Sequence, residues 1–88
     1  MKFESIIILK ENVENDEKEK LLNEIKKFMK EPTIEEWGIK KMAYPVKGHE
    51  KGYYIIFNFK AEHTDIEQLE DFYKKENNII KYITVLNS

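Results

Sequence analysis

The sequence predicts an α+β fold whose four strands and two helices follow one another in the order β-α-β-β-α-β. Four short segments are rich in β-branched and aromatic residues, and two segments between them repeat apolar residues at helical spacing. The 88 residues are enough for one domain, 1–88. Two helices of this size cannot cover both faces of a four-stranded sheet. We therefore expect a four-stranded antiparallel sheet with both helices on one face, a ferredoxin-like sandwich.

The N-terminal third predicts a strand followed by a helix. Residues 3–9 are rich in isoleucine and bounded by polar sequence, as in a mostly buried strand. Asp16 with Glu19 has the spacing of an acidic capping box, and Pro32 lacks the N–H that a helix interior needs. We therefore expect a helix over residues 16–30. Its apolar stripe consists of Leu21, Leu22, Ile25, Phe28 and Met29.

The middle of the chain predicts a β-hairpin. Residues 37–46 form the second strand, and Pro45 favours an edge strand because it cannot donate a backbone hydrogen bond. Residues 47–52 contain two glycines and form the expected loop. The third strand, residues 53–60, alternates between two faces. The core face holds Tyr53, Ile55, Phe57 and Phe59; the other face, which the helices leave uncovered, holds Tyr54, Ile56, Asn58 and Lys60.

The C-terminal third predicts the second helix and the fourth strand. Thr64 with Glu67 matches a capping box, and Asn77-Asn78 can adopt the left-handed conformation that ends a helix. Residues 79–86 form the last strand. The sequence does not decide which face of the first and fourth strands points outward, because the run Ile6-Ile7-Ile8 fits either register. The buried stripe of the helix consists of Ile66, Leu69, Phe72 and Tyr73.

The composition excludes most kinds of catalysis. The chain has no cysteine, no arginine and three glycines, which rules out thiol nucleophiles, cysteine-rich metal sites and glycine-rich phosphate loops. His49 and His63 have no partner at metal-ligand spacing, and neither Ser5 nor Ser88 lies beside a histidine. We expect no enzyme, no metal and no cofactor. The chain has no run of 18 apolar residues and no secretory signal pattern, so we expect neither a membrane span nor secretion.

Charge is distributed unevenly along the chain. The net charge is −2, yet residues 37–60 carry five lysines and one acid. Residues 11–36 carry nine acids and five lysines, and residues 61–78 carry six acids and two lysines. The basic block falls on predicted strands and the acidic blocks mostly on predicted helices. Such a domain can present a basic surface to a polyanion although the chain is acidic overall. Solvated lysines beside charged helices are the alternative.

The third strand carries a partial signal for nucleic acid. The segment Lys51 to Asn58 follows the RNA-recognition-motif signature at its basic, glycine, first aromatic and aliphatic positions. The small residue and the second and final aromatic residues of that signature are missing. The first strand also lacks an exposed aromatic residue that could stack a second base, since Phe3 lies too early.

One motif is more specific: Glu36-Trp37-Gly38-Ile39-Lys40-Lys41-Met42-Ala43-Tyr44-Pro45-Val46. It resembles the signature of the bacterial small-subunit ribosomal protein six family, which reads acidic-Trp-Gly, a basic pair, an aliphatic residue and Ala-Tyr-Pro-aliphatic. Phe3-Glu4, Gly52-Tyr53 and the last strand with Lys81 are similar to the same family, so the resemblance covers essentially the whole chain. Family arginines are lysines here, the link at residues 31–33 is a few residues short, and the long charged tail is absent.

The resemblance implies a ferredoxin-like fold and a structural role in the small ribosomal subunit, and hence a cytoplasmic location on the ribosome. It also implies two partners, small-subunit ribosomal protein eighteen and the central domain of the small-subunit ribosomal RNA, which the two proteins bind as a pair. A strongly basic partner can supply much of the phosphate contact, which suits an acidic chain. The isolated chain is then expected to be a monomer.

We place the candidate contacts on exposed lysines and on the open face of the sheet. The RNA-binding candidates are Lys2, Lys40, Lys41, Tyr44 and Lys81. Lysine supplies charge without fixed geometry, so these residues should position the domain on phosphates and read little sequence. For Tyr44, edge-strand packing is an equal alternative, and Trp37 is expected to pack on the core. The partner-binding candidates Tyr54, Ile56 and Asn58 form an exposed patch of the kind that marks an interface.

Two other functional classes stay open, because this fold serves many functions. A ferredoxin-like regulatory or small-molecule-binding domain would dimerise through its open sheet face and be stabilised by its ligand. An isolated RNA-recognition domain would bind single-stranded RNA without a partner.

Overall fold

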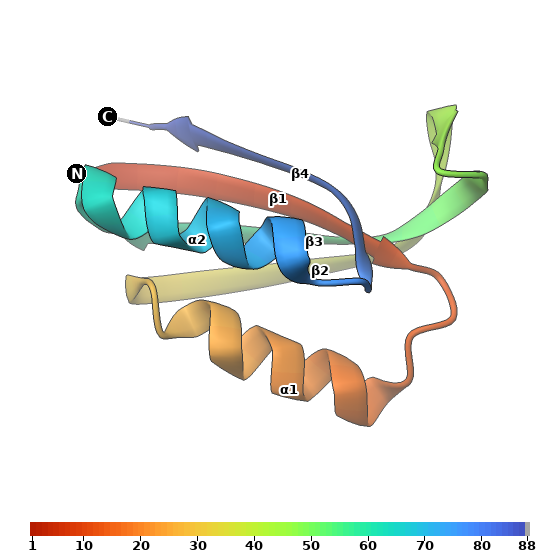
Figure 1. The fold of residues 1–88 in the computed structure, drawn as a ribbon, viewed down its shortest axis with the longest axis horizontal. Coiled ribbons are helices and arrows are strands. Elements are labelled where there is room, and N and C mark those ends of the chain that lie inside the picture. Colours follow the sequence, from red (N-terminus) through yellow and green to blue (C-terminus); the bar gives the residue numbers. More distant parts are fainter. Residues whose placement is uncertain (88) are drawn as a thin grey trace.

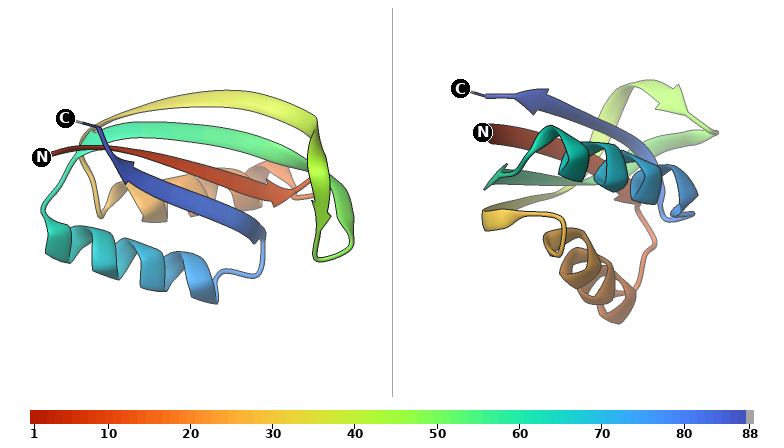
Figure 2. Two further views of the ribbon diagram at one scale, coloured as in Figure 1. Left: turned by 90° about the horizontal axis from the view of Figure 1, so that it is seen from above. Right: turned by 60° about the vertical axis from the view of Figure 1, so that its left-hand side comes forward.

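The computed structural model describes residues 1–87, and these follow the predicted order of elements (Figure 1). The elements are β1 (Lys2–Lys10), α1 (Asn15–Lys26), β2 (Lys30–Val46), β3 (His49–Lys60), α2 (His63–Lys75) and β4 (Ile79–Leu86). The strands form one antiparallel sheet in the order β2-β3-β1-β4. Both helices lie on the same side of this sheet, as Figure 2 shows from above. The predicted ferredoxin-like α+β sandwich is therefore confirmed.

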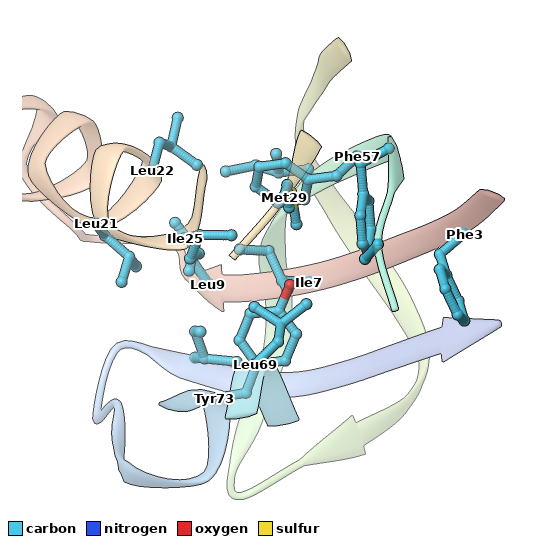
Figure 3. Packing of buried hydrophobic residues seen from close by; sticks show 14 residues of the cluster. Phe3, Ile7, Leu9, Leu21, Leu22, Ile25, Met29, Phe57, Leu69 and Tyr73 are labelled. Carbon is cyan, nitrogen blue, oxygen red and sulfur yellow. The ribbon is translucent and has the colours of Figure 1, made fainter. Parts of the chain in front are cut away.

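The main core lies between the helices and the sheet. Alternate residues of β1 and β3 point toward the helices because side chains in a strand alternate between faces. The central members are Phe3, Ile7, Leu9, Ile55, Phe57 and Phe59 from these strands, with Leu21, Leu22, Ile25, Leu69 and Tyr73 from the helices (Figure 3). Each fully buried aliphatic side chain contributes about 1.5–3 kcal/mol relative to exposure. The apolar stripes predicted for the helices and for the third strand thus supply side chains of this core.

A second, smaller cluster lies on the opposite side of the sheet, which we call the open face. Its buried members are Ile8, Met42 and Ile80, with Val46 and Tyr54 partly buried against them. Ile8 lies opposite Tyr54 in the sheet, whereas its neighbour Ile7 lies opposite the core residue Ile55. This fixes the register that the isoleucine run left open, because Ile6 must then share the open face with Ile8.

The first helix is shorter and the second strand longer than predicted. α1 ends at Lys26 instead of residue 30, and β2 begins at Lys30 instead of residue 37. Pro32 lies inside β2, at a point where the pairing with β3 shifts between Lys30 and Thr33. At an irregularity of an edge strand, the missing N–H of proline leaves the ladder intact. Pro45 lies in the same edge strand, as predicted.

The capping residues also differ from the prediction. In α2 the box is formed by Glu62 and Asp65, whose carboxylate accepts a hydrogen bond from the Glu62 N–H at 2.9 Å. The Thr64–Glu67 pair lies inside the helix instead. The Asp16–Glu19 pair likewise follows the helix start at Asn15, and α1 has no side-chain cap hydrogen bond. Acidic residues in a first turn still favour the helix through its dipole.

The hairpin turn is tighter than the predicted loop of residues 47–52, because β3 already begins at His49. Gly52 therefore lies inside β3, where it pairs with Lys10 of β1. A Cβ at this position would overlap the Ile8 side chain and crowd the Leu9 carbonyl. The glycine thus leaves room for the Ile8 side chain against β3 and does not mark a turn.

Candidate nucleic-acid and partner interface

The β2–β3 hairpin extends beyond the rest of the sheet. Gly52 of β3 pairs both with Lys10, the last residue of β1, and with Lys40 of β2. Residues 41–51, which we call the arm, therefore continue past the end of β1, as the green hairpin shows in Figure 1. The arm carries Lys41, Lys47 and Lys51, which are all exposed. This end of the molecule is basic.

Tyr44 lies on the outer side of the arm. The pairing of β2 with β3 is interrupted between Lys41 and Val46, so the residues between them leave the ladder. Met42 turns onto the open face and is buried, whereas Tyr44 is 83% exposed. Edge-strand packing of Tyr44 is therefore wrong, and its ring is accessible to a partner molecule.

Trp37 does not pack on the core as expected. The pairing with β3 shifts between Glu36 and Gly38, and the indole is 51% exposed. Its Nε1–H donates a hydrogen bond to Glu35 Oε2 at 3.1 Å. The Lys40 Nζ lies over the ring, 4.6 Å from its centroid, as a cation–π pair. The bulge thus moves the indole out of the core and beside one of the candidate lysines.

The other two candidate lysines lie away from the arm. Lys81 of β4 is opposite Ile8 and shares the open face, about three strand spacings (about 14 Å) across the sheet from β2. Lys2 pairs with Lys60, eight residues along β3 from Gly52, which corresponds to about 26 Å. The fold therefore gathers Lys40, Lys41 and Tyr44 at one end and places Lys2 at the other.

The three partner-binding candidates all lie on the open face, because they pair with Glu4, Ile6 and Ile8 of β1. They are less exposed than expected. Ile56 is only 5% exposed, and Tyr54 and Asn58 are half-buried. The exposed apolar side chains on this face belong to β4 instead, where Ile83 and Val85 are 55% and 45% exposed. The alternation Lys81, Ile83, Val85 in the sequence is the signal that could have identified them once the register of β1 was known.

An ion pair joins α1 to the edge strand on the helix side of the sheet. The Lys18 Nζ lies 2.7 Å from Glu36 Oε1, which also accepts a hydrogen bond from the Tyr53 hydroxyl at 2.8 Å. The hydrogen bond from Lys18, reinforced by that from Tyr53, lowers the pKa of the Glu36 carboxyl. The same hydrogen bond to Glu36 raises the pKa of Lys18. Lys18 and Glu36 therefore neutralise each other inside the domain, and we do not count them in the candidate interface.

Residues 1–87 offer little for chemistry. They contain no group of three His, Asp or Glu side chains placed to hold a metal ion. Among them, no helix is long and apolar enough to cross a bilayer. His63 begins α2 and stays exposed to solvent, while its ring meets that of Phe3 edge-on with centroids 5.9 Å apart. What the surface presents is a basic arm, an apolar open face and acidic helices.

Comparison with known proteins gives one consistent result. The family model described as ribosomal protein S6 matches residues 2–86. The small ribosomal subunit protein bS6 of Lawsonia intracellularis is 33% identical, covering 96% of this chain and 84% of that protein. The bS6 protein of Fervidobacterium nodosum is 30% identical, covering 93% of this chain and 71% of that protein. The crystal structure of 30S ribosomal protein S6 from Thermotoga maritima superposes with a TM-score of 0.85 at 30% identity, covering 96% of this chain and 84% of the other.

Proposed function

The chain belongs to the ribosomal protein S6 family, and from this premise we propose that it pairs with ribosomal protein eighteen and binds the central domain of the small-subunit ribosomal RNA. In this role it is a structural constituent of the bacterial ribosome and not an enzyme. The observation that carries the proposal is the basic arm, whose three lysines are exposed, on a chain whose net charge is −2. A basic end on an acidic chain favours an approach to RNA in which that end leads.

The division of labour follows from the side chains. Lys40, Lys41 and the exposed Tyr44 lie together at the arm and can contact phosphates and an unpaired base. Lysine cannot grip a phosphate with two parallel hydrogen bonds as arginine does. A few lysines alone give weak and strongly salt-dependent binding. A basic partner is therefore needed for tight binding, and the open face is the surface that the helices leave for it.

A gel-shift titration tests this proposal. The probe is a central-domain RNA fragment, titrated with the chain at two salt concentrations, with and without its cognate protein eighteen. We expect tight binding only when both proteins are present. The double variant Lys40→Glu with Lys41→Glu should weaken the ternary complex roughly tenfold or more, because two phosphate contacts become repulsive.

Lys74→Glu with Lys75→Glu is the matched control. These two lysines are also adjacent and exposed, but they lie at the end of α2 on the other side of the sheet. The control makes the same change in net charge and should bind as the unmodified chain does. Equal losses in both double variants would mean that only net charge matters. Tight RNA binding without protein eighteen would favour an isolated RNA-recognition domain, and a stable homodimer that ignores both partners would favour a regulatory domain.

A further inference from the structure

The two edges of the sheet are built differently. The β2 edge carries Pro32 and Pro45, and its pairing with β3 is irregular at three places. Bulges, prolines and charges of this kind keep an edge strand from pairing with another chain. The β4 edge has one irregularity, opposite Ile8 and Leu9 near its start, and then continues regularly to Leu86. It contains no proline, no glycine and a single charge, Lys81. Of the two edges that residues 1–87 form, the β4 edge is therefore the one better suited to pair with a further strand.

The backbone groups that β4 presents outward follow from its pairing. The Asn87 N–H donates to the Lys2 carbonyl at 2.8 Å, so Asn87 points toward β1. In an antiparallel ladder the N–H and C=O of one residue point to the same side, and this side alternates along the strand. Val85 and Ile83 therefore also bond to β1. Tyr82, Thr84 and Leu86 point away from it, and no strand of residues 1–87 lies on that side.

Apolar side chains flank these outward groups. Ile83 lies opposite Ile6, which in turn lies opposite Ile56, so the three isoleucines form a row across the open face. The row is closed at its β3 end, where Ile56 is 5% exposed, and open at β4, where Ile83 is 55% exposed. A strand added beside β4 would extend this row by one side chain and cover Ile83 and Val85.

We propose that the free edge of β4 is a strand-addition site, which binds an extended segment of the partner protein through the backbone of Tyr82, Thr84 and Leu86. The inference rests on the proposed function for the existence of the partner, and it names how that partner is held. The segment should carry apolar side chains at alternate positions. These side chains would lie on the open face, next to the apolar Ile83 and Val85. The remainder of the partner then continues over the open face.

A second copy of the chain fits this edge less well. Two β4 strands paired edge to edge would meet along a strip about 27 Å long and about 10 Å deep, on the order of 270 Å² from each copy. A stable complex buries about 800 Å² per partner. Such a dimer would also leave Ile6 and Tyr54 uncovered, one and two strands away from the edge. A partner that adds a strand and continues over the open face covers both surfaces.

Amide hydrogen exchange of the full chain, alone and bound to its cognate protein eighteen on the RNA fragment, tests the inference. In the free chain, the outward amides of Tyr82, Thr84 and Leu86 should exchange faster than the inward amides of Ile83 and Val85. In the complex the outward amides should slow by roughly tenfold or more, since each gains a hydrogen bond.

Two pairs of variants separate the edge from the rest of the surface. Leu86→Pro removes one outward N–H without touching the bonds to β1, and it should weaken the complex roughly fivefold relative to Leu86→Ala. Ile83→Lys places a charge beside the edge and should weaken it at least as much. Its control is Ile39→Lys, because Ile39 is also 55% exposed but lies on the other edge strand opposite the core-side Tyr53. Ile39→Lys should bind within twofold of the unmodified chain.

The outcomes distinguish the inference from the function on which it rests. A complex that forms while the outward amides keep exchanging rapidly overturns strand addition and leaves the proposed function intact. Absence of any complex with RNA and protein eighteen overturns both. Protection of the outward amides in the free chain that grows with its concentration would identify a second copy as the occupant and overturn the choice of partner.

Discussion

A serine at the centre of the core shows how one polar residue is tolerated there. Ser5 is fully buried in β1, and its Oγ lies 2.8 Å from the Tyr73 hydroxyl and 3.0 Å from Thr84 Oγ1. The three hydroxyls connect β1 to α2 and to β4. Burial strongly raises the pKa of Tyr73, so its hydroxyl keeps its proton and remains a hydrogen-bond donor. A buried hydroxyl is stable only while such a partner is present.

The two ends of the Ser5–Tyr73 hydrogen bond should respond unequally to substitution. Tyr73→Phe leaves Ser5 bonded to Thr84, so we expect a loss of about 0.5–1.5 kcal/mol in the free energy of unfolding. Ser5→Ala leaves the buried Tyr73 hydroxyl without its partner, which costs about 1–3 kcal/mol. The double variant should lose less than the sum of the two. Urea unfolding of the four proteins measures this, and strictly additive losses would show that the hydroxyls are not coupled.

Among the elements, the predicted strands and helices all exist, and the errors lie where tertiary context overrides a local signal. Pro32 is a helix breaker in isolation, so the sequence suggested that the second strand starts well after it. In the sheet it lies at an irregularity of an edge strand, which its ring tolerates. Gly52 looked like a loop residue, yet it permits the close approach of β3 to Ile8. Neither reason is visible until the strand order is known.

The same limit applies to the candidate surface. The alternation of β3 correctly assigned Tyr54 to the open face, but the exposure of Ile56 could not be judged without knowing that Ile6 lies beside it. Trp37 was expected in the core because large aromatic residues usually are, and only the bulge after Glu36 reveals why it is outside. A sequence gives the period of each strand, whereas the neighbours of a side chain come from the register between strands.

The Lys18–Glu36 pair should make the attachment of α1 to β2 depend on pH. The pKa of the Glu36 carboxyl is lowered in the folded protein, so its contribution is complete above the ordinary carboxyl pKa of about 4.5. This contribution is lost as the pH falls through the folded pKa. Because the pair is partly exposed, Glu36→Gln should cost about 0.5–1 kcal/mol at pH 7, and this cost should shrink as the pH falls below about 4.5.

Urea midpoints at several pH values check this prediction. Glu35→Gln is the control: it makes the same change one residue away, and its amide oxygen can still accept the hydrogen bond from the Trp37 indole. The control should show no such pH-dependent loss. A Glu36→Gln deficit that stayed constant down to pH 3 would mean that packing, and not the ion pair, accounts for the loss. The pKa of Lys18 is raised in the folded protein, so the stability that the charged Lys18 contributes is present below about pH 10.5. It is lost as the pH rises above that value.

At the scale of the whole molecule, the fold converts a charge pattern along the sequence into a pattern in space. The acidic blocks form much of the two helices on one side of the sheet, and the basic block includes the arm beyond the end of the sheet. The longest dimension is 33 Å, about three to four times the screening length at physiological salt. The arm and the helix side of the molecule therefore present separate electrostatic surfaces, and the small net charge of −2 describes neither of them.

The salt dependence of RNA binding should show how many phosphates each of these lysines neutralises. Each neutralised phosphate contributes about 0.7–0.9 to the slope of log affinity against log salt concentration. Lys40→Gln with Lys41→Gln should reduce the slope by about 1.4–1.8, and Lys2→Gln by about 0.7–0.9. Because Lys2 lies about 26 Å from the arm, well beyond the screening length, the triple variant should show the sum of the two reductions. Fluorescence anisotropy of the ternary complex at four salt concentrations gives the slopes. A Lys2→Gln slope equal to that of the unmodified chain would confine the RNA contact to the arm end of the molecule.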